Sequence, residues 1–261
     1  YSFEPKHDWS RKFVAQPEIL EYMEACVTKY QLEPHIQFNQ AVTSATFDDH
    51  SNQWRVVTET GDTFNADVLI TATGQLNRPA IPNIPGLETF RGACFHSARW
   101  QHHTELRNKR VAVIGTGASA IQFVPEITPL VGQLDLYQRS AAWVLPKPDR
   151  PFHQFEQALF KKLPLSDRLY RGLIYWKNES RALAFTRFSW ILDLFAHQAR
   201  KEARRWVTDP DKLHHLIPDY RIGCKRILIS NDWYRAVNQP HVNLLTDGIA
   251  RIDETGIVSE T

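Results

Sequence analysis

An α/β fold is predicted by the order of patterns along the sequence. The apolar run RVAVI, residues 110–114, leads into the glycine-containing segment GTGASA and the helical stretch IQFVPEI, which is the order of a strand, a loop and a helix. Earlier in the chain, short segments rich in β-branched and aromatic residues alternate with turn-prone segments. The sequence therefore predicts a Rossmann-like domain with a helical insertion, together with part of a second domain that contains a small antiparallel β-meander.

The composition is that of an ordinary globular protein. The 261 residues are 43% hydrophobic and 23% charged, which is enough for a sizeable core and about two domains. The 31 Lys and Arg residues nearly balance the 29 Asp and Glu residues, for a formal net charge of +2. This charge gives no electrostatic case for a nucleic acid or an anionic membrane as the main partner.

The cysteines and the hydrophobicity of the chain indicate its cellular location. Cys26, Cys94 and Cys224 lie far apart without a CxxC pair, so neither a disulfide framework nor a thiolate zinc site is predicted, and a reduced, cytoplasmic setting fits. No signal-peptide core and no run of about 18 apolar residues occurs, so we expect a chain that is neither secreted nor membrane-spanning. The chain starts with Tyr1 and ends at GIVSET, and we expect it to be an internal portion of a longer protein.

The first part of the chain is predicted to form a helix followed by strands. The helix QPEILEYMEACVTKYQL begins with Pro17, which suits a first turn, and Glu18, which complements the helix dipole. Its apolar face would consist of Ile19, Leu20, Met23 and Val27. Strands are predicted within HIQFNQAVTSATFD, QWRVVTET and TFNADVLITATG, with turns at DDHSN and TGD, and the meander leads into a buried strand, ADVLITAT.

The second part of the chain is predicted to contain the nucleotide-binding sheet. RVAVI would be a strand covered on both faces, QLDLYQ the next strand, and RIGCKRILIS and VNLLTD strands that rejoin the sheet. The region from roughly Phe152 to Val207 is predicted to be helical, and its interspersed charges favour a packed insertion over a membrane anchor. We expect residues 1–107 to form a partial domain and linker, 108–146 and 220–261 the nucleotide-binding domain, and 147–219 the insertion.

GTGASA matches a dinucleotide-binding fingerprint. Gly115 would permit a tight turn, Gly117 would let the backbone approach a pyrophosphate, and the small Ala120 would let the following helix pack on the strand. The alternative, a glycine turn without a ligand, is less favoured because strand, loop and helix occur in the required order.

The end of the next strand favours NADPH over NADH. An NAD site would place Asp or Glu about 20 residues after the fingerprint, where this sequence has Gln138, Arg139 and Ser140. Arg139 can pair with a 2′-phosphate through two parallel hydrogen bonds and Ser140 can donate a hydroxyl group, although Arg139 could instead be a solvated strand-end charge. Asp135 lies in the middle of the strand and is interpreted as structural.

Two further segments contain candidate functional residues. FRGACFHSARW places Phe90, Gly92, His96 and Trp100 at spacings that fit neither a strand nor a helix. In CKR, Lys225 and Arg226 precede the apolar run ILI and would point to opposite sides if the strand begins there. The histidine pairs 102–103 and 214–215 have no HExxH motif or carboxylate partner, so no metal site is predicted.

These motifs together resemble one enzyme family. FRGACFHSARW matches the FxGxxxHxxxW fingerprint of flavin-dependent Baeyer-Villiger monooxygenases, and GTGASAIQ resembles the NADPH loop of that family. ATGQLNRPAIPNIPG resembles the segment that leaves the FAD domain, QPEIL the helix near the active-site mouth, and GCKRILISNDWY the segment that bears the active-site arginine. The resemblance runs from Tyr1 to about Asp247. It departs from the family at Gln101, where Pro or Asp is usual, and in lacking the N-terminal GxGxxG for FAD.

The resemblance implies an NADPH- and O₂-dependent enzyme with FAD that converts an apolar ketone to an ester or lactone through a flavin C4a-peroxide. By residue match, Arg226 supplies the positive charge beside the peroxide, and His96 couples the two cofactor domains, with Phe90 and Trp100 as anchors of the linker. Lys225 matches the position that reaches the 2′-phosphate. The resemblance implies that the remaining cofactor-binding positions are Gln16, Gly74, Gly115, Thr116, Gly117, Ala118, Ser119, Ala120, Gln122, Arg139 and Ser140.

Two other functions stay open at this point. One is an N- or S-oxidising flavin-containing monooxygenase, in which the peroxide must be held protonated. The other is a non-catalytic NADP-binding or interaction module, because a single GxGxxA leaves the chain poorly equipped to hold FAD by itself.

Overall fold

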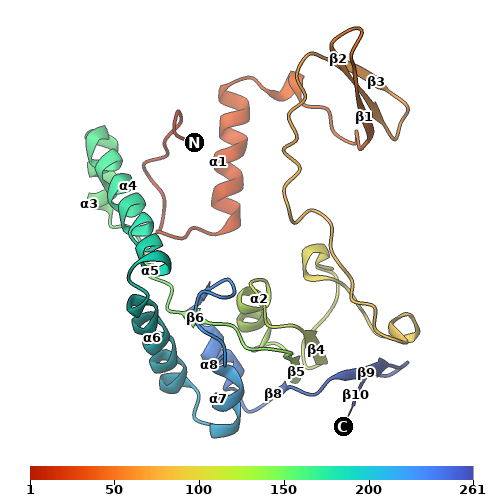
Figure 1. Cartoon of the computed structure of the whole chain (residues 1–261), viewed down its shortest axis with the longest axis vertical. Coiled ribbons are helices and arrows are strands. Elements are labelled where there is room, and N and C mark those ends of the chain that lie inside the picture. The colour runs from red at the N-terminus through yellow and green to blue at the C-terminus, as the bar shows by residue number, and fades with distance from the viewer. Residues whose placement is uncertain (261) are drawn as a thin grey trace. The chain divides into compact units, whose positions relative to one another are not determined.

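The computed structural model describes residues 1–260 and has a mixed α/β fold, as predicted (Figure 1). The chain divides into two compact units. The first consists of Tyr1–Arg78 with Asp149–Asp167, and the second of Pro79–Pro148 with the chain from Arg168 onward. The assignment of separate regions to the two cofactors stays a prediction.

The first unit contains the predicted antiparallel meander. Strands β1 (Val42–Asp48), β2 (Gln53–Thr58) and β3 (Thr63–Ala66) form a three-stranded sheet in that order. The turns between the strands use residues that tolerate a positive φ, Asn52 at 53° and Gly61 at 88°. The strand and turn predictions for this region are therefore confirmed.

Helix α1 (Gln16–Lys29) forms where predicted, but three of the four residues of its predicted apolar face are exposed and the fourth, Val27, is half-buried. Ile19, Leu20 and Met23 are exposed, and Cys26 is the helix residue that is buried. The N-terminal segment lies over the side of the helix that carries Cys26, where Glu4 and Lys6 line a pocket together with it. The first unit also contains helix α3 (Gln154–Lys162) and the short 3₁₀ helix η1 (Glu33–His35).

The buried strand predicted at ADVLITAT does not form. Residues 67–73 have no strand assignment, and the side chains of Val68 and Ile70 are 72% and 82% exposed. A strand needs a neighbour to pair its main-chain N–H and C=O groups, and among the described residues no segment pairs with this one. The β-branched composition is therefore insufficient, by itself, to make a strand here.

The second unit is built on a parallel sheet. Strands β4 (Arg110–Ile114), β5 (Gln133–Tyr137) and β8 (Val242–Leu245) pair in the order β4-β5-β8. Helix α2 (Ala120–Ile127) and helix α8 (Trp233–Val237) pack with the strands in one apolar core. The strands predicted at RVAVI, QLDLYQ and VNLLTD are thus confirmed.

Two predictions about these strands are wrong in detail. Strand β4 is not covered on both faces: Val113 is buried, but the side chain of the neighbouring Ile114, which points to the opposite face, is 45% exposed. RILI does not rejoin the parallel sheet. Strand β7 (Leu228–Ile229) pairs instead with β6 (Val144–Leu145) in a separate two-stranded sheet.

The remaining elements lie in the second unit, except that residues 164–167, at the start of the next helix, belong to the first unit. The predicted helical region contains α4 (Pro164–Glu179), α5 (Ala182–Thr186) and α6 (Trp190–Trp206), followed by α7 (Pro210–Leu216). Helix α6 packs through four buried residues, whereas Trp176 on α4 is exposed. The described residues include no helix that is long and apolar enough to cross a membrane. The other short elements are η2 (Leu87–Thr89), η3 (Ser97–Arg99), β9 (Ile249–Ile252) and β10 (Ile257–Ser259).

Candidate functional site

The glycine-rich loop has the backbone that a dinucleotide loop requires. Gly115 adopts a φ of 104°, which residues with a side chain rarely adopt, and its N–H donates to the Tyr137 carbonyl at 2.8 Å. Gly117 has an ordinary φ, and a Cβ atom at this position would meet no atom within 4 Å. The open space beside Gly117 lets another molecule approach the backbone closely. Helix α2 begins at Ala120, directly after the loop, so its N-terminal N–H groups face an anion placed there.

The end of strand β5 lies against this loop. The Thr116 hydroxyl group is 3.5 Å from the Ser140 carbonyl oxygen, and the Ser140 hydroxyl accepts a 3.1 Å hydrogen bond from the Lys225 ammonium. Gln138 is buried, and its side chain donates to the His215 carbonyl at 2.7 Å. The fold therefore brings Thr116, Ser140 and Lys225 together although they lie far apart in the sequence.

The charges at this site fit an anion. Arg139 and Lys225 are exposed, and neither forms an ion pair with a carboxylate among the described residues. Asp135, by contrast, is bonded to Gln133 at 2.8 Å and Asn243 at 2.7 Å, which agrees with the structural role predicted for it. Two uncompensated cations and a hydroxyl group beside a glycine loop suit the 2′-phosphate of NADPH.

Arg226 has no hydrogen-bond or ion-pair partner within residues 1–260, which the structure describes. It lies one residue before Ile227 and two before the start of β7, and the described residues give its guanidinium group no hydrogen bond or ion pair. Because β7 begins only at Leu228, the expectation that strand alternation separates Arg226 from Lys225 does not apply: both residues lie in the turn that precedes the strand. The pairing of β7 with β6 fixes the C-terminal end of this turn.

The spacing of Phe90 and Gly92 has a local cause. A Cβ atom at Gly92 would come within 2.6 Å of two ring carbons of Phe90, so a larger residue at this position would displace the ring. Further on, the Trp100 ring lies 5.3 Å from the ring of Phe95 and 5.3 Å from that of Phe123 on α2. Trp100 thereby attaches this segment to the core of the second unit.

His96 lies between these two contacts. Its Nδ1 atom accepts a 3.0 Å hydrogen bond from the Ala98 N–H, which caps the short helix η3. A direct role for His96 in coupling two domains stays a prediction.

The remaining predicted positions lie in the first turn of α2 and in the first unit. The Gln122 side chain donates to the Ala118 carbonyl at 2.7 Å, and the Ser119 carbonyl accepts from the Gln122 N–H at 3.0 Å, so both residues stabilise the first turn of α2. Gly74, with a φ of 73°, and Gln16, at the first position of α1, belong to the first unit and are exposed. Their contacts with a cofactor stay predictions.

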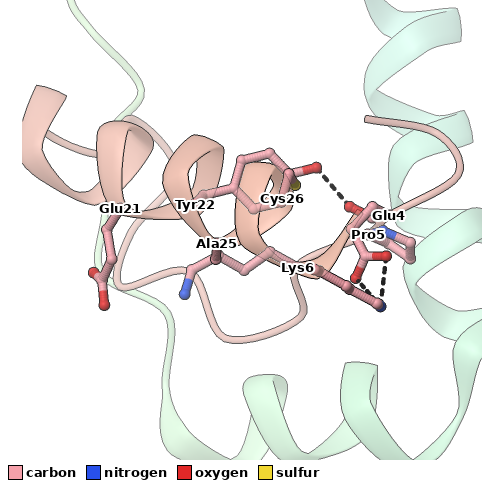
Figure 2. A pocket seen from close by; sticks show the side chains of 8 residues that line it. Glu4, Pro5, Lys6, Glu21, Tyr22, Ala25 and Cys26 are labelled. Carbon is pink, nitrogen blue, oxygen red and sulfur yellow. Dashed lines mark hydrogen bonds and ion pairs between the residues drawn. The ribbon is translucent and has the colours of Figure 1, made fainter. Parts of the chain in front are cut away.

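A cavity in the first unit is not the predicted site. It has a volume of about 220 Å³ and lies between the N-terminal segment and helix α1 (Figure 2). Lys29 contacts both carboxylate oxygens of Glu4, at 2.8 and 2.7 Å, and the Tyr22 hydroxyl donates to the Glu4 carbonyl at 2.6 Å. Its lining contains none of the predicted residues. Across the described part of the chain, no group of three or more His, Cys, Asp or Glu residues could hold a metal ion.

Sequence reasoning missed one residue of the site, Tyr220. Its ring lies 4.5 Å from the Lys225 ammonium, and burial raises the pKa of its hydroxyl group above the ordinary value. No periodicity relates two residues five positions apart in an irregular turn, so the sequence carries no signal for this contact.

The chain is similar along nearly its whole length to known monooxygenases. The chain is 42% identical, over 99% of its length, to a Baeyer-Villiger monooxygenase of Pseudomonas aeruginosa. Among solved structures it resembles a steroid monooxygenase bound to NADP, with a TM-score of 0.84, 31% identity and 99% of this chain and 57% of that chain covered. A cyclohexanone monooxygenase with bound ε-caprolactone gives a TM-score of 0.84 at 27% identity and covers 97% of this chain and 57% of that chain.

The matches cover most of this chain but only part of its relatives. The chain spans about half the length of the curated relatives it matches, since it covers 49% of the Pseudomonas aeruginosa protein. The family model described as flavin-binding monooxygenase-like matches residues 1–185, which is more than half of this chain. The chain therefore belongs to the flavin-binding monooxygenase-like family.

Proposed function

We propose that this protein is an FAD- and NADPH-dependent Baeyer-Villiger monooxygenase. Such an enzyme inserts one oxygen atom of O₂ next to a carbonyl group and converts a ketone to an ester or a lactone. The observation that carries the proposal is the complete fingerprint Phe90, Gly92, His96 and Trp100 in a chain 42% identical to a Baeyer-Villiger monooxygenase. An apolar ketone as substrate is supported by the neighbour that binds ε-caprolactone, a lactone product of this chemistry.

NADPH fits the residues of the second unit. The N-terminus of α2 and the loop from Gly115 to Ser119 would hold the pyrophosphate. Arg139, Ser140 and Lys225 would hold the 2′-phosphate, as supported by the 3.1 Å contact between Ser140 and Lys225 and by the absence of carboxylate partners for both cations in the described residues. An adenine dinucleotide without a 2′-phosphate would leave these cations unused.

FAD is proposed from the family and not from a fit to this chain. The described residues contain one glycine-rich loop between a strand and a helix, and the NADPH assignment uses it. FAD would supply the activation of O₂. The contribution that we assign to this chain is the guanidinium group of Arg226, which stays protonated, has no partner among the described residues, and can stabilise negative charge that develops at the reacting oxygen.

Product analysis tests the proposal. The full-length gene product, supplied with FAD, NADPH and ¹⁸O₂, is incubated with a panel of apolar ketones and, in parallel, with thioethers. We expect an ester or lactone that contains one ¹⁸O atom from at least one ketone. Sulfoxide formation from thioethers without any ester from the ketone panel would refute the proposal and favour a heteroatom-oxidising enzyme.

A cytoplasmic location stays a prediction from the wide spacing of the three cysteines, which are free in the structure.

A further inference from the structure

Two contacts define the place of the Lys225 ammonium. The ring of Tyr220 lies 4.5 Å from Nζ, within the range of a cation–π interaction, and the Ser140 hydroxyl accepts its hydrogen bond at 3.1 Å. Without such contacts a lysine side chain samples many rotamers, and ordering it on ligand binding reduces affinity. The ring and the hydroxyl group therefore hold the ammonium beside the end of β5 before a ligand arrives.

Tyr220 is itself fixed to the segment that follows Ser140. Its hydroxyl group donates to the Ala141 carbonyl at 3.0 Å, and its own carbonyl accepts from the indole N–H of Trp143 at 3.0 Å. Trp143 is 2% exposed and belongs to an apolar cluster, so its indole group is a rigid anchor. These two hydrogen bonds link the backbone next to Ser140 to the backbone that leads to Lys225.

A tight turn brings Lys225 back over the ring. The Cys224 N–H donates to the Arg221 carbonyl at 3.1 Å, and Gly223 adopts a φ of 99° between them. The Phe185 ring lies so close to Gly223 that a Cβ atom there would be 2.6 Å from a ring carbon. The turn therefore needs glycine for its φ and for the approach of Phe185.

We propose that Tyr220 is a positioning residue that holds Lys225 at the 2′-phosphate site and thereby contributes to the discrimination between NADPH and NADH. The inference rests on the NADPH site of the proposed function. In this role Tyr220 needs no contact with the phosphate. It acts by orienting the ammonium, so its effect is confined to ligands that carry a 2′-phosphate.

Binding of two small ligands to the purified chain tests this role. 2′,5′-ADP and 5′-AMP differ by the 2′-phosphate, and the ratio of their dissociation constants, measured by calorimetry, reports its recognition. We expect Tyr220→Leu to reduce this ratio by about two- to fivefold, the size of an exposed cation–π interaction. Tyr220→Phe, which keeps the ring, should restore the ratio. In the Lys225→Met background, Tyr220→Leu should have no further effect. The control Tyr175→Leu, at an exposed aromatic position of α4, should leave the ratio unchanged.

The outcomes separate this inference from the proposed function. If the unmodified chain does not prefer 2′,5′-ADP, the NADPH site itself is wrong. If Lys225→Met removes the preference but Tyr220→Leu keeps it, the site stands and the role of Tyr220 is overturned. If Tyr220→Leu does not fold, pentafluorophenylalanine at position 220 replaces it, because this residue keeps the shape of the ring and reverses its quadrupole. An unchanged ratio with that substitution would equally overturn the inference.

Discussion

The two glycines of the nucleotide loop should respond differently to the same substitution. Gly115 has a φ of 104°, so Ala at this position strains the backbone, at a cost of about 1–2 kcal/mol. Gly117 has an ordinary φ and open space around it, so Ala should fit and stabilise the chain by about 0.4–1 kcal/mol through the unfolded state. The methyl group of Gly117→Ala would, however, occupy the space that the pyrophosphate needs, and we expect NADPH affinity to fall about tenfold or more.

Thermal unfolding and calorimetric titration with NADPH measure the two effects separately. Gly115→Ala should lower the melting temperature of the second unit by about 2–4 °C per kcal/mol, and Gly117→Ala should not lower it. Gly172→Ala, within helix α4 and without close neighbours, serves as the control that should bind NADPH normally. Normal NADPH affinity in Gly117→Ala would refute the reasoning, because the backbone at this glycine would then not face the pyrophosphate.

Three further outcomes follow from single side chains. Arg139→Ala should weaken NADPH binding about tenfold and leave NADH binding nearly unchanged, and equal losses for both in paired titrations would argue against the 2′-phosphate assignment. In the full-length protein, Arg226→Ala should still allow NADPH to reduce the flavin, followed by absorbance, but abolish ester formation, and an unchanged ester yield would remove Arg226 from the chemistry. Glu156 is bonded to Arg150 at 2.6 and 2.7 Å and to the His153 N–H, and these contacts lower the pKa of Glu156 to about 2. Because this pKa lies below the ordinary value of 4.5, the stabilisation is present above pH 4.5 and is lost as the pH falls toward 2. Glu156→Gln should therefore destabilise the chain toward urea at pH 7 and converge with the unmodified chain near pH 2, and a difference independent of pH would contradict the ion-pair explanation.

The parts of the fold that were predictable from sequence are those fixed by neighbouring residues. RVAVI, GTGASA and IQFVPEI each carry their own signal, and the unit of β4, loop and α2 forms as expected. The turn at Gly61 likewise follows from a residue that tolerates its φ of 88°. Local chemistry is sufficient in these cases because the hydrogen bonds or dihedral angles that decide the structure lie within a few residues.

The strand predictions are wrong where the structure of a segment depends on a partner that is distant in the sequence. ADVLITAT has the composition of a strand, but a strand requires a second segment, and among the described residues none pairs with it. RILI has the same composition and finds a partner in β6, a strand outside the parallel sheet. The site shows the same limit: Arg139 and Ser140 follow from their place after β5, whereas Tyr220 depends on the Trp143 and Ala141 contacts, which join residues nearly 80 positions apart.

The fingerprint segment can now be divided into packing and polar functions. Phe90 and Gly92 form one local contact, and Trp100 is held by Phe123 on the helix that follows the nucleotide loop. Packing contacts within the second unit therefore explain why these three positions are Phe, Gly and Trp. In His96, Nδ1 accepts the Ala98 N–H, so in the neutral ring the proton lies on Nε2. Nε2 is thus a donor without a partner among the described residues. A coupling role of His96 would act through this donor, and its partner would be an acceptor such as a carbonyl or a carboxylate oxygen.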